Sequence, residues 1–327
     1  MFSAAGYPYN WQAAVFAGEI GVGDDITGIK LMPGSSATAA LLVTSRNNTY
    51  LLYGTGYASW NFVSYNNGCG ALDYTCQNMA DTYMMDDRGV TALKTSLVYG
   101  NFDTSTLTYS INKFIDQHRS TASYAALNRL KSQYRIFFKD GYGLYITIVN
   151  GTLVGIMPVY FPTPVYMADD GKYSNGAEAN FFCGTDGYLY QMDQGTSFDG
   201  LPMNEFLTLN FDPSNSARVR KRYRKAAVEM SGSGYCSFSF GYTLSYGNSD
   251  ISQSNYASYS SNAQLMQWDN FTWDNFVWDG QTVVPSECEM TGTGENVAIT
   301  IRASSPYVQP YTLNSIILHY SYRRALR

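Results

Sequence analysis

The sequence has few charged residues and no long apolar run. Charged side chains make up 14% of its 327 residues, against about 25% in an average soluble protein, so much of the surface must be neutral and polar or covered by partners. No window approaches the roughly 18 apolar residues of a membrane-spanning helix, and the first residues lack the basic and apolar parts of a signal peptide. We therefore expect synthesis in the cytoplasm and no insertion into a membrane.

Residues that commonly carry catalysis or hold metals are also scarce. The 2 histidines, His118 and His319, lie in no zinc-binding pattern. The chain also has no nucleophile elbow, no phosphate-binding loop and no dinucleotide-binding glycine motif. Its five cysteines are too widely spaced for a zinc site or a disulfide scaffold, so we expect buried free thiols. The sequence predicts no enzyme, no catalytic residue, no metal and no cofactor.

Paired carboxylates leave one enzymatic alternative open. Two carboxyl groups on either side of a glycosidic bond can act as acid and base. The candidate pairs are Asp86 with Asp87, Asp169 with Asp170, and Asp193 with Asp199. Because aspartate is also a preferred turn residue, a glycosidase is the weaker hypothesis.

A short sequence phrase recurs along the first part of the chain. Small or polar residues precede an alternating aromatic and aliphatic run, and a glycine-centred turn follows it. The phrase occurs at residues 49–56, 82–89, 142–151 and 186–195. Such runs predict strands, and repeated strand units must pack on one another to bury their apolar faces. We therefore predict an all-β protein with β-propeller-like blades over residues 1–200.

Two segments within residues 1–200 have patterns that do not predict strands. Ile111, Phe114, Ile115 and His118 have helical spacing, and good helix formers follow as far as Leu130, so we expect a short helical insertion at about 107–132. The proline-rich segment from Pro158, with the D-D-G-K sequence that follows it, predicts a loop.

The composition changes near residue 201. Ser, Tyr, Gly and Asn become frequent, and two alternating segments, 297–302 and 315–324, are typical of paired strands with one polar face. We expect a C-terminal β unit over 201–327. The sequence leaves open whether this unit completes the propeller or forms a separate sandwich.

A basic strand is the sharpest local anomaly in an acidic chain of net charge −5. Period-two alternation places Arg218, Arg220, Arg222 and Arg224 on one face. Such a stripe fits the phosphate backbone of DNA, an acidic patch on a neighbouring subunit, or a solvated edge strand protected by its charge. Because arginine occupies the whole stripe and its planar fork suits fixed pairing, we favour the subunit interface.

A tryptophan run follows in W-D-N-F-T-W-D-N-F-V-W-D-G. Trp268, Trp273 and Trp278 recur every five residues, a spacing that fits neither one helix face nor one strand face. Successive Asp-Asn turns with packed aromatic rings explain the pattern. A subunit interface and a platform for sugar remain open alternatives.

The order of these segments resembles a known family. M-F-S-A-A-G-Y-P-Y-N-W, L-L-V-T-S-R-N-N-T-Y-L-L-Y-G, D-T-Y-M-M-D-D-R-G-V and D-G-Y-L-Y-Q-M-D-Q-G-T-S-F-D-G are similar to the β-propeller part of tail proteins of short-tailed (podovirus-type) bacteriophages, the nozzle or tail-tube component. The R-K-R-Y-R-K strand, the W-D repeats and the closing S-Y-R-R resemble the same group.

The resemblance implies a structural virion protein without enzymatic activity. Its copies would form a ring, a homohexamer, around the DNA channel of the tail, below the portal and adaptor and next to other tail proteins. Contact with genomic DNA during ejection would be transient and non-specific. The alternative class is a carbohydrate- or receptor-binding, lectin-like propeller that uses the tryptophan run.

Overall fold

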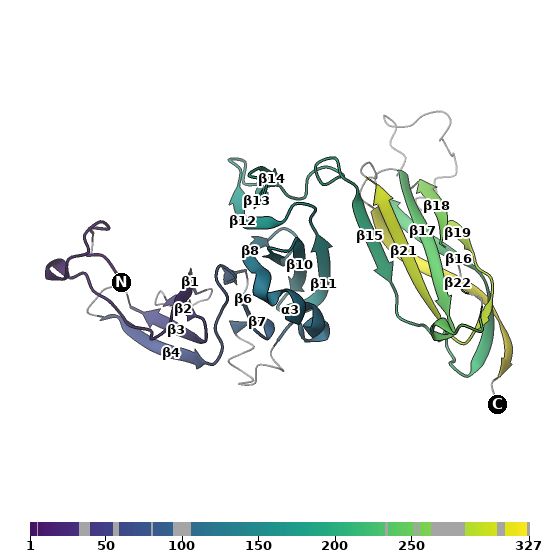
Figure 1. The fold of residues 1–327 in the computed structure, drawn as a ribbon, viewed down its shortest axis with the longest axis horizontal. Coiled ribbons are helices and arrows are strands. Elements are labelled where there is room, and N and C mark those ends of the chain that lie inside the picture. The colour runs from purple at the N-terminus through teal and green to yellow at the C-terminus, as the bar shows by residue number, and fades with distance from the viewer. Residues whose placement is uncertain are drawn as a thin grey trace. The chain divides into compact units, whose positions relative to one another are not determined.

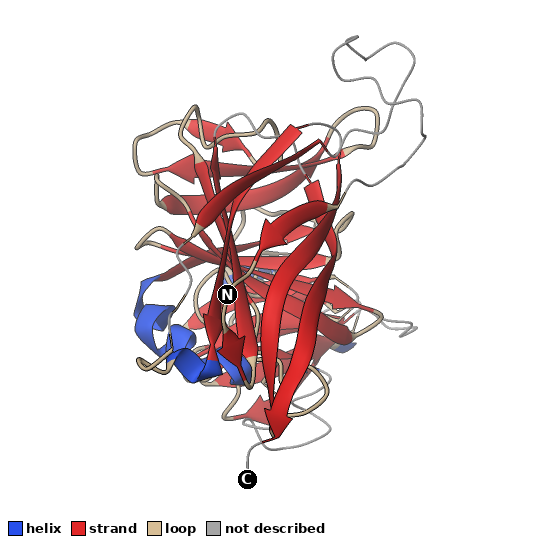
Figure 2. Cartoon of the chain, turned by 90° about the vertical axis from the view of Figure 1, so that its right-hand side faces the viewer, coloured by secondary structure: helices blue, strands red, loops and turns tan. Residues whose placement is uncertain are grey.

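The computed structural model describes residues 1–4, 6–32, 40–54, 59–79, 81–93, 106–232, 235–251, 253, 256–262, 285–305 and 311–325. The chain divides into two compact units, Met1–Gln194 (unit 1) and Gly195–Arg327 (unit 2). Strands dominate both units and all pair antiparallel, which confirms the all-β prediction (Figures 1 and 2). No helix in these ranges has the length and apolar character needed to cross a membrane.

Unit 1 is built from four antiparallel sheets, each made of strands that follow one another in the sequence. The first sheet contains β1 (Ile26–Leu31), β2 (Ala40–Ser45), β3 (Asn48–Tyr53) and β4 (Asn61–Asn67). The second contains β5 (Gln77–Asn78), β6 (Thr82–Asp86) and β7 (Gly89–Ala92). The third contains β8 (Ala122–Asn128), β9 (Gln133–Phe138), β10 (Tyr142–Val149) and β11 (Thr152–Tyr160), and the fourth β12 (Val165–Lys172), β13 (Glu178–Gly184) and β14 (Leu189–Gln191). Up-and-down sheets of this kind are what propeller blades contain, while closure of the blades into a propeller stays a prediction.

Strand β6 joins two apolar cores of unit 1. All five of its residues are buried, and successive side chains of a strand point to opposite faces. Tyr83 and Met85 pack into a core with residues of β7 to β10, whereas Met84 packs into a second core with Leu42 and Leu51 of the first sheet. This two-sided burial explains why the T-Y-M-M-D run contains no exposed polar position.

The helical insertion is shorter than the sequence predicts. Two short 3-10 turns, Tyr109–Ile111 and Arg119–Thr121, flank α3 (Asn112–His118), and the chain then enters β8. The predicted helix is therefore wrong beyond residue 121. One edge of β8 pairs with β9, while on the other side Ala125 bonds through its N–H to the Tyr74 carbonyl and through its carbonyl to the Gln77 amide. Ala125 and Ala126 are completely buried, and this tertiary packing overrides their helix propensity.

The predicted loop after Pro158 is also wrong in part. Strand β11 continues through Pro158 to Tyr160, and residues 165–172 form β12, paired with β13. Among the described strands β11 is the outer one of its sheet, where a missing N–H removes no ladder hydrogen bond. Only the residues between the two strands connect them as a loop.

Unit 2 is a sandwich of two antiparallel sheets. Its strands are β15 (Met203–Thr208), β16 (Val219–Gly232), β17 (Tyr235–Leu244), β18 (Ala257–Asn262), β19 (Ser286–Glu289), β20 (Thr293–Gly294), β21 (Val297–Ser305) and β22 (Tyr311–Ala325). One sheet has the order β15-β21-β17-β18; in the other, β16 pairs with β22 on one edge and with β19 and β20 on the other. Buried residues of both sheets, among them Val228, Phe240 and Ile299, form one core. Short 3-10 turns lie at Ala13–Val15 in unit 1 and Ser245–Gly247 in unit 2.

Candidate functional site

The basic segment 218–224 alternates between exposed arginines and less exposed residues. Arg218, Arg220, Arg222 and Arg224 are all exposed. Between them, Lys221 and Tyr223 are 0% and 1% exposed. Because alternate residues of a strand share a face, Arg220 and Arg222 lie on one outer face of β16. Arg224 is exposed at the bulge between Tyr223 and Lys225, and Arg218 lies in the turn just before the strand.

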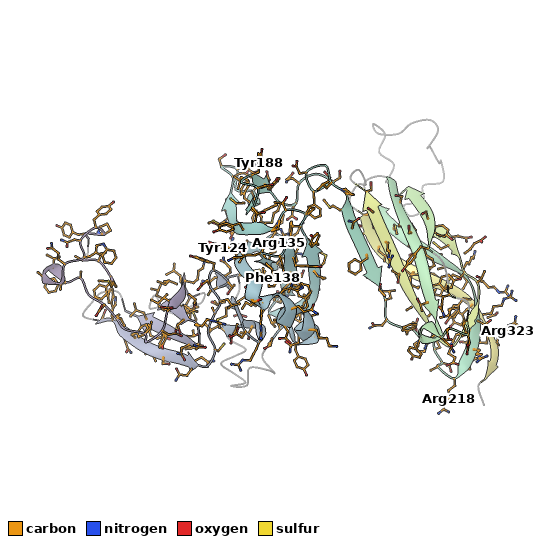
Figure 3. All side chains as sticks on the ribbon, viewed as in Figure 1. Tyr124, Arg135, Phe138, Tyr188, Arg218 and Arg323 are labelled. Carbon is orange, nitrogen blue, oxygen red and sulfur yellow. The ribbon has the colours of Figure 1, made fainter. Side chains whose placement is uncertain are left out.

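Strand β22 widens this stripe into a two-strand surface. Arg222 lies opposite Ser321 and Lys225 opposite His319 in the antiparallel register. Opposite residues share a face, so Ser321 lies on the outer side with Arg222. His319 and Arg323, two residues to either side of Ser321, share that face, and both are exposed; Figure 3 labels Arg323. We call this surface the arginine face; it consists of Arg218, Arg220, Arg222, Arg224, His319 and Arg323. The closing R-R of the sequence contains Arg323, but only the β16–β22 register places it beside the arginines of residues 218–224.

Little of the positive charge on the arginine face is neutralised. Arg220 Nε lies 3.9 Å from Glu295 Oε1, and exposed pairs of this kind contribute at most about 1 kcal/mol. For the other arginines of the face, no carboxylate of the described chain lies within ion-pair distance. Residues 195–327 carry 10 Lys and Arg against 11 Asp and Glu, so the face is a local separation of charge in a nearly neutral unit.

The buried Lys221 anchors this part of β16. Its ammonium group donates hydrogen bonds to the backbone carbonyls of Ser216, of Val219 at 3.1 Å and of Glu295 at 2.8 Å. Burial lowers the pKa of Lys221, because desolvation penalises the charged form. The three carbonyls satisfy its donors and tie β16 to the loop before β21, which fixes the direction of the neighbouring arginines.

The sequence also singles out the tryptophan run and the Asp169–Asp170 pair as candidate sites. Trp268, Trp273 and Trp278 lie outside the described residues. Asp169 and Asp170 are neighbours on β12, so their side chains point to opposite faces of the sheet. That arrangement does not suit two carboxyl groups acting on one bond. Within the described ranges, no cluster of three or more His, Cys, Asp or Glu could hold a metal ion.

Asp86 is buried in unit 1, and Asp199 lies in a turn of unit 2. Asp86 is buried beside Arg46, whose Nη1 lies 3.6 Å from its Oδ1. Burial raises the pKa of Asp86 more than the hydrogen bond from the Asp87 N–H and the neighbouring arginines lower it. Asp199 occupies a turn with a φ of 49°, a left-handed conformation that aspartate tolerates. Asp199 therefore lies in a turn, the role that the sequence suggests for these aspartates, whereas Asp86 is a buried residue at the end of β6.

Asp193 neutralises a buried arginine of unit 1. Arg135 on β9 is 0% exposed, and its Nη2 lies 2.7 Å from Asp193 Oδ2. Lys131 and Asn128 also contact this carboxylate. Burial raises the pKa of Asp193, but the charge and hydrogen bond of Arg135, together with Lys131, outweigh it and hold this pKa below its ordinary value. Figure 3 shows Arg135 inside unit 1. The carboxylate of Asp193 therefore has a structural role, because it neutralises a charge in the core.

A scan against protein-family models gives no match, and a search of curated proteins gives none either. The fold and the arginine face are the structural features of this chain that bear on its function.

Proposed function

We propose that this chain is a structural component of a phage tail or neck. Copies of it would form a ring, a nozzle or tube, around the DNA channel below the portal and adaptor, without catalysis. The observation that carries the proposal is the arginine face. Its guanidinium groups are exposed, and among the described residues only Arg220 has a carboxylate within ion-pair distance. In a chain of net charge −5, they form a surface suited to an anionic partner. The resemblance to tail proteins of short-tailed phages supports the same assignment.

Exposed apolar strands in unit 1 also support assembly with further copies. Both β1 and β11 are outer strands of their sheets as described. On β1, Ile29 and Leu31 are 53% and 70% exposed, and on β11, Val154 and Met157 are 66% and 52% exposed. Monomeric proteins usually protect such edges with charge or cover them. Neighbouring subunits would cover them in a ring.

The arginine face would pair mainly with carboxylates of a neighbouring subunit. Arginine presents a planar fork that binds a carboxylate through two parallel hydrogen bonds. Contact with passing DNA would be weaker and non-specific, because phosphate contacts lose affinity steeply with salt and the net negative charge of the chain repels DNA. Loose contact suits a conduit through which DNA must move.

Native mass spectrometry of the purified chain tests the ring. We expect a closed oligomer of identical subunits, six by the resemblance, and the same chain in purified virions. A chain that stays monomeric and is missing from purified particles would contradict the proposal.

A double variant tests the arginine face itself. Arg220→Ala with Arg222→Ala should yield monomers, since losing one partner of a desolvated pair costs about 3 to 5 kcal/mol. The matched control is Lys139→Ala with Lys172→Ala, which removes two exposed charges from unit 1 and should leave the ring intact. Normal rings with altered DNA retention in the arginine variant would assign the face to DNA instead.

A further inference from the structure

A groove crosses the outer face of the sheet β15-β21-β17-β18 in unit 2. It has a volume of about 530 Å³ and is lined by residues of all four strands. It lies on the sheet that does not carry the arginine face. The proposed ring function does not use this groove.

The strand register explains why the sheet is hollow here. Phe206 of β15 lies opposite Arg302 of β21, Arg302 opposite Ser239 of β17, and Ser239 opposite Ser258 of β18. The residues next to Ser239 on β17, Phe238 and Phe240, point inward and belong to the core. The outward positions of β17 and β18 in this row, Ser239 and Ser258, carry short hydroxyl side chains, and these form the low floor of the groove.

One exposed aromatic ring and one guanidinium group, those of Phe206 and Arg302, line the groove beside this floor. Phe206 is 75% exposed on the β15 side. On the β18 side, the ring of Tyr256 lies against Gly241, where a Cβ atom would come within 2.5 Å of it. The Arg302 guanidinium carbon lies 4.2 Å from the centre of the Tyr256 ring, a cation–π distance. This stacking holds the guanidinium over the floor while its N–H groups remain able to bind an anion.

The polar lining can form hydrogen bonds on both sides of a ligand. Ser304 donates to Asn204 Oδ1 at 2.7 Å, which orients the amide so that its NH₂ group can donate elsewhere. The hydroxyls of Ser239 and Ser258 lie 3.5 Å apart and either can donate. The one carboxylate among the lining residues, Glu205, accepts a hydrogen bond from the Tyr311 hydroxyl at 2.7 Å.

We propose that this groove binds an acidic oligosaccharide. The apolar face of a sugar ring would pack on Phe206, its hydroxyls would bond to Asn204 and the serines, and its carboxylate or sulfate would pair with Arg302. Hydroxyl-rich ligands need many neutral donors and acceptors, which this floor provides. A single cation is too few for nucleic acid, which requires several phosphate contacts.

A glycan array tests the proposal with sialylated, uronic-acid-containing and neutral glycans. We expect binding to acidic glycans and at least tenfold weaker binding by Arg302→Gln and by Phe206→Ala. The control is Leu207→Ala on the same strand, outside the lining, which should bind normally. Ser258→Trp, at an exposed position, should fill the groove and abolish binding without touching the core, and circular dichroism would verify that each variant is folded.

The negative outcomes are equally specific. Binding to no glycan would overturn the proposal, and binding to neutral glycans alone would remove the role of Arg302. Binding that survives both Arg302→Gln and Phe206→Ala but is lost in Trp273→Ala would place the sugar site on the tryptophan run. Ring formation is measured separately, so failure of either proposal leaves the other standing.

Discussion

Replacing Asp193 with asparagine tests the buried ion pair of unit 1. The substitution removes the charge but keeps the shape of the side chain. It also suits the backbone, because Asp193 has a φ of 60° and asparagine is one of the few residues that tolerate this left-handed region. Alanine would add backbone strain and confuse the measurement. The variant therefore isolates the electrostatic contribution of one carboxylate to a completely buried arginine.

The expected loss in free energy of unfolding depends on the contacts that Arg135 keeps in the variant. Removing one partner of a buried ion pair costs about 3 to 5 kcal/mol. In the variant, Arg135 retains the Gln133 side-chain oxygen, 2.8 Å from Nη2, and the Tyr145 ring, 4.2 Å from its guanidinium carbon. We therefore expect the lower end, about 3 kcal/mol. For a unit of this size that corresponds to a fall of roughly 6 to 12 °C in melting temperature.

Hydrogen–deuterium exchange provides a local readout. Peptides from β8, β9 and β10 should lose protection in Asp193→Asn, while peptides from β17 and β21 of unit 2 serve as an internal reference. Asp199→Asn is the matched control, since Asp199 also lies in a left-handed turn, whereas the carboxylate that pairs with Arg135 is that of Asp193. A loss below about 1 kcal/mol for Asp193→Asn would show that Gln133 and Tyr145 alone satisfy Arg135, and the reasoning would be wrong.

The pH dependence gives an independent check with a definite sign. The folded pKa of Asp193 lies below its ordinary value, so the unfolded chain takes up a proton first as the pH falls. The stabilisation by the pair is complete above about pH 4 and is lost as the pH falls through the folded pKa. The difference in stability between the wild-type chain and Asp193→Asn should therefore shrink below about pH 4.

Three further substitutions or reactions test other parts of the fold. Gly70→Ala places a Cβ 2.4 Å from two backbone carbonyl oxygens and should destabilise unit 1 by about 1 to 3 kcal/mol in urea unfolding, whereas Gly155→Ala, with nothing within 4 Å, should not. Lys221→Met leaves three backbone carbonyls without their donor and should cost about 3 kcal/mol in unit 2, measured by exchange of β16 peptides, whereas the exposed Arg222→Met should change stability by less than about 0.5 kcal/mol. Burial raises the pKa of the Cys288 thiol to about 12, so this thiol should resist iodoacetamide at pH 8 until the protein is unfolded, as followed by mass spectrometry.

The sequence predicts well those features that are encoded locally. Strands such as β3 and β10 are runs of aromatic and aliphatic residues that end at glycine turns, so their pattern alone predicts them. The outward direction of Arg220 and Arg222 follows from period two in the same way. These features need no knowledge of distant parts of the chain.

Features that depend on distant packing could not be predicted in this way. Ala125 and Ala126 favour a helix in isolation and become a strand only because neighbours bury them. Arg323 joins the arginine face, and Phe206 meets Arg302, only through pairings between segments far apart in sequence. The register between distant strands leaves no periodic signal in the local sequence. The β22 part of the arginine face and the whole outer groove were therefore not predicted.

The two units should differ in how they fold. Each sheet of unit 1 pairs neighbouring strands through short connections, so it can form as soon as those residues have been synthesised. In unit 2, Met203 pairs with Ser305 and Val219 with Ala325, so β15 and β16 must wait for partners made much later. Unit 1 should therefore reach its native structure first during refolding, and the exposed strands of unit 2 would be the segments that need protection from aggregation in the meantime.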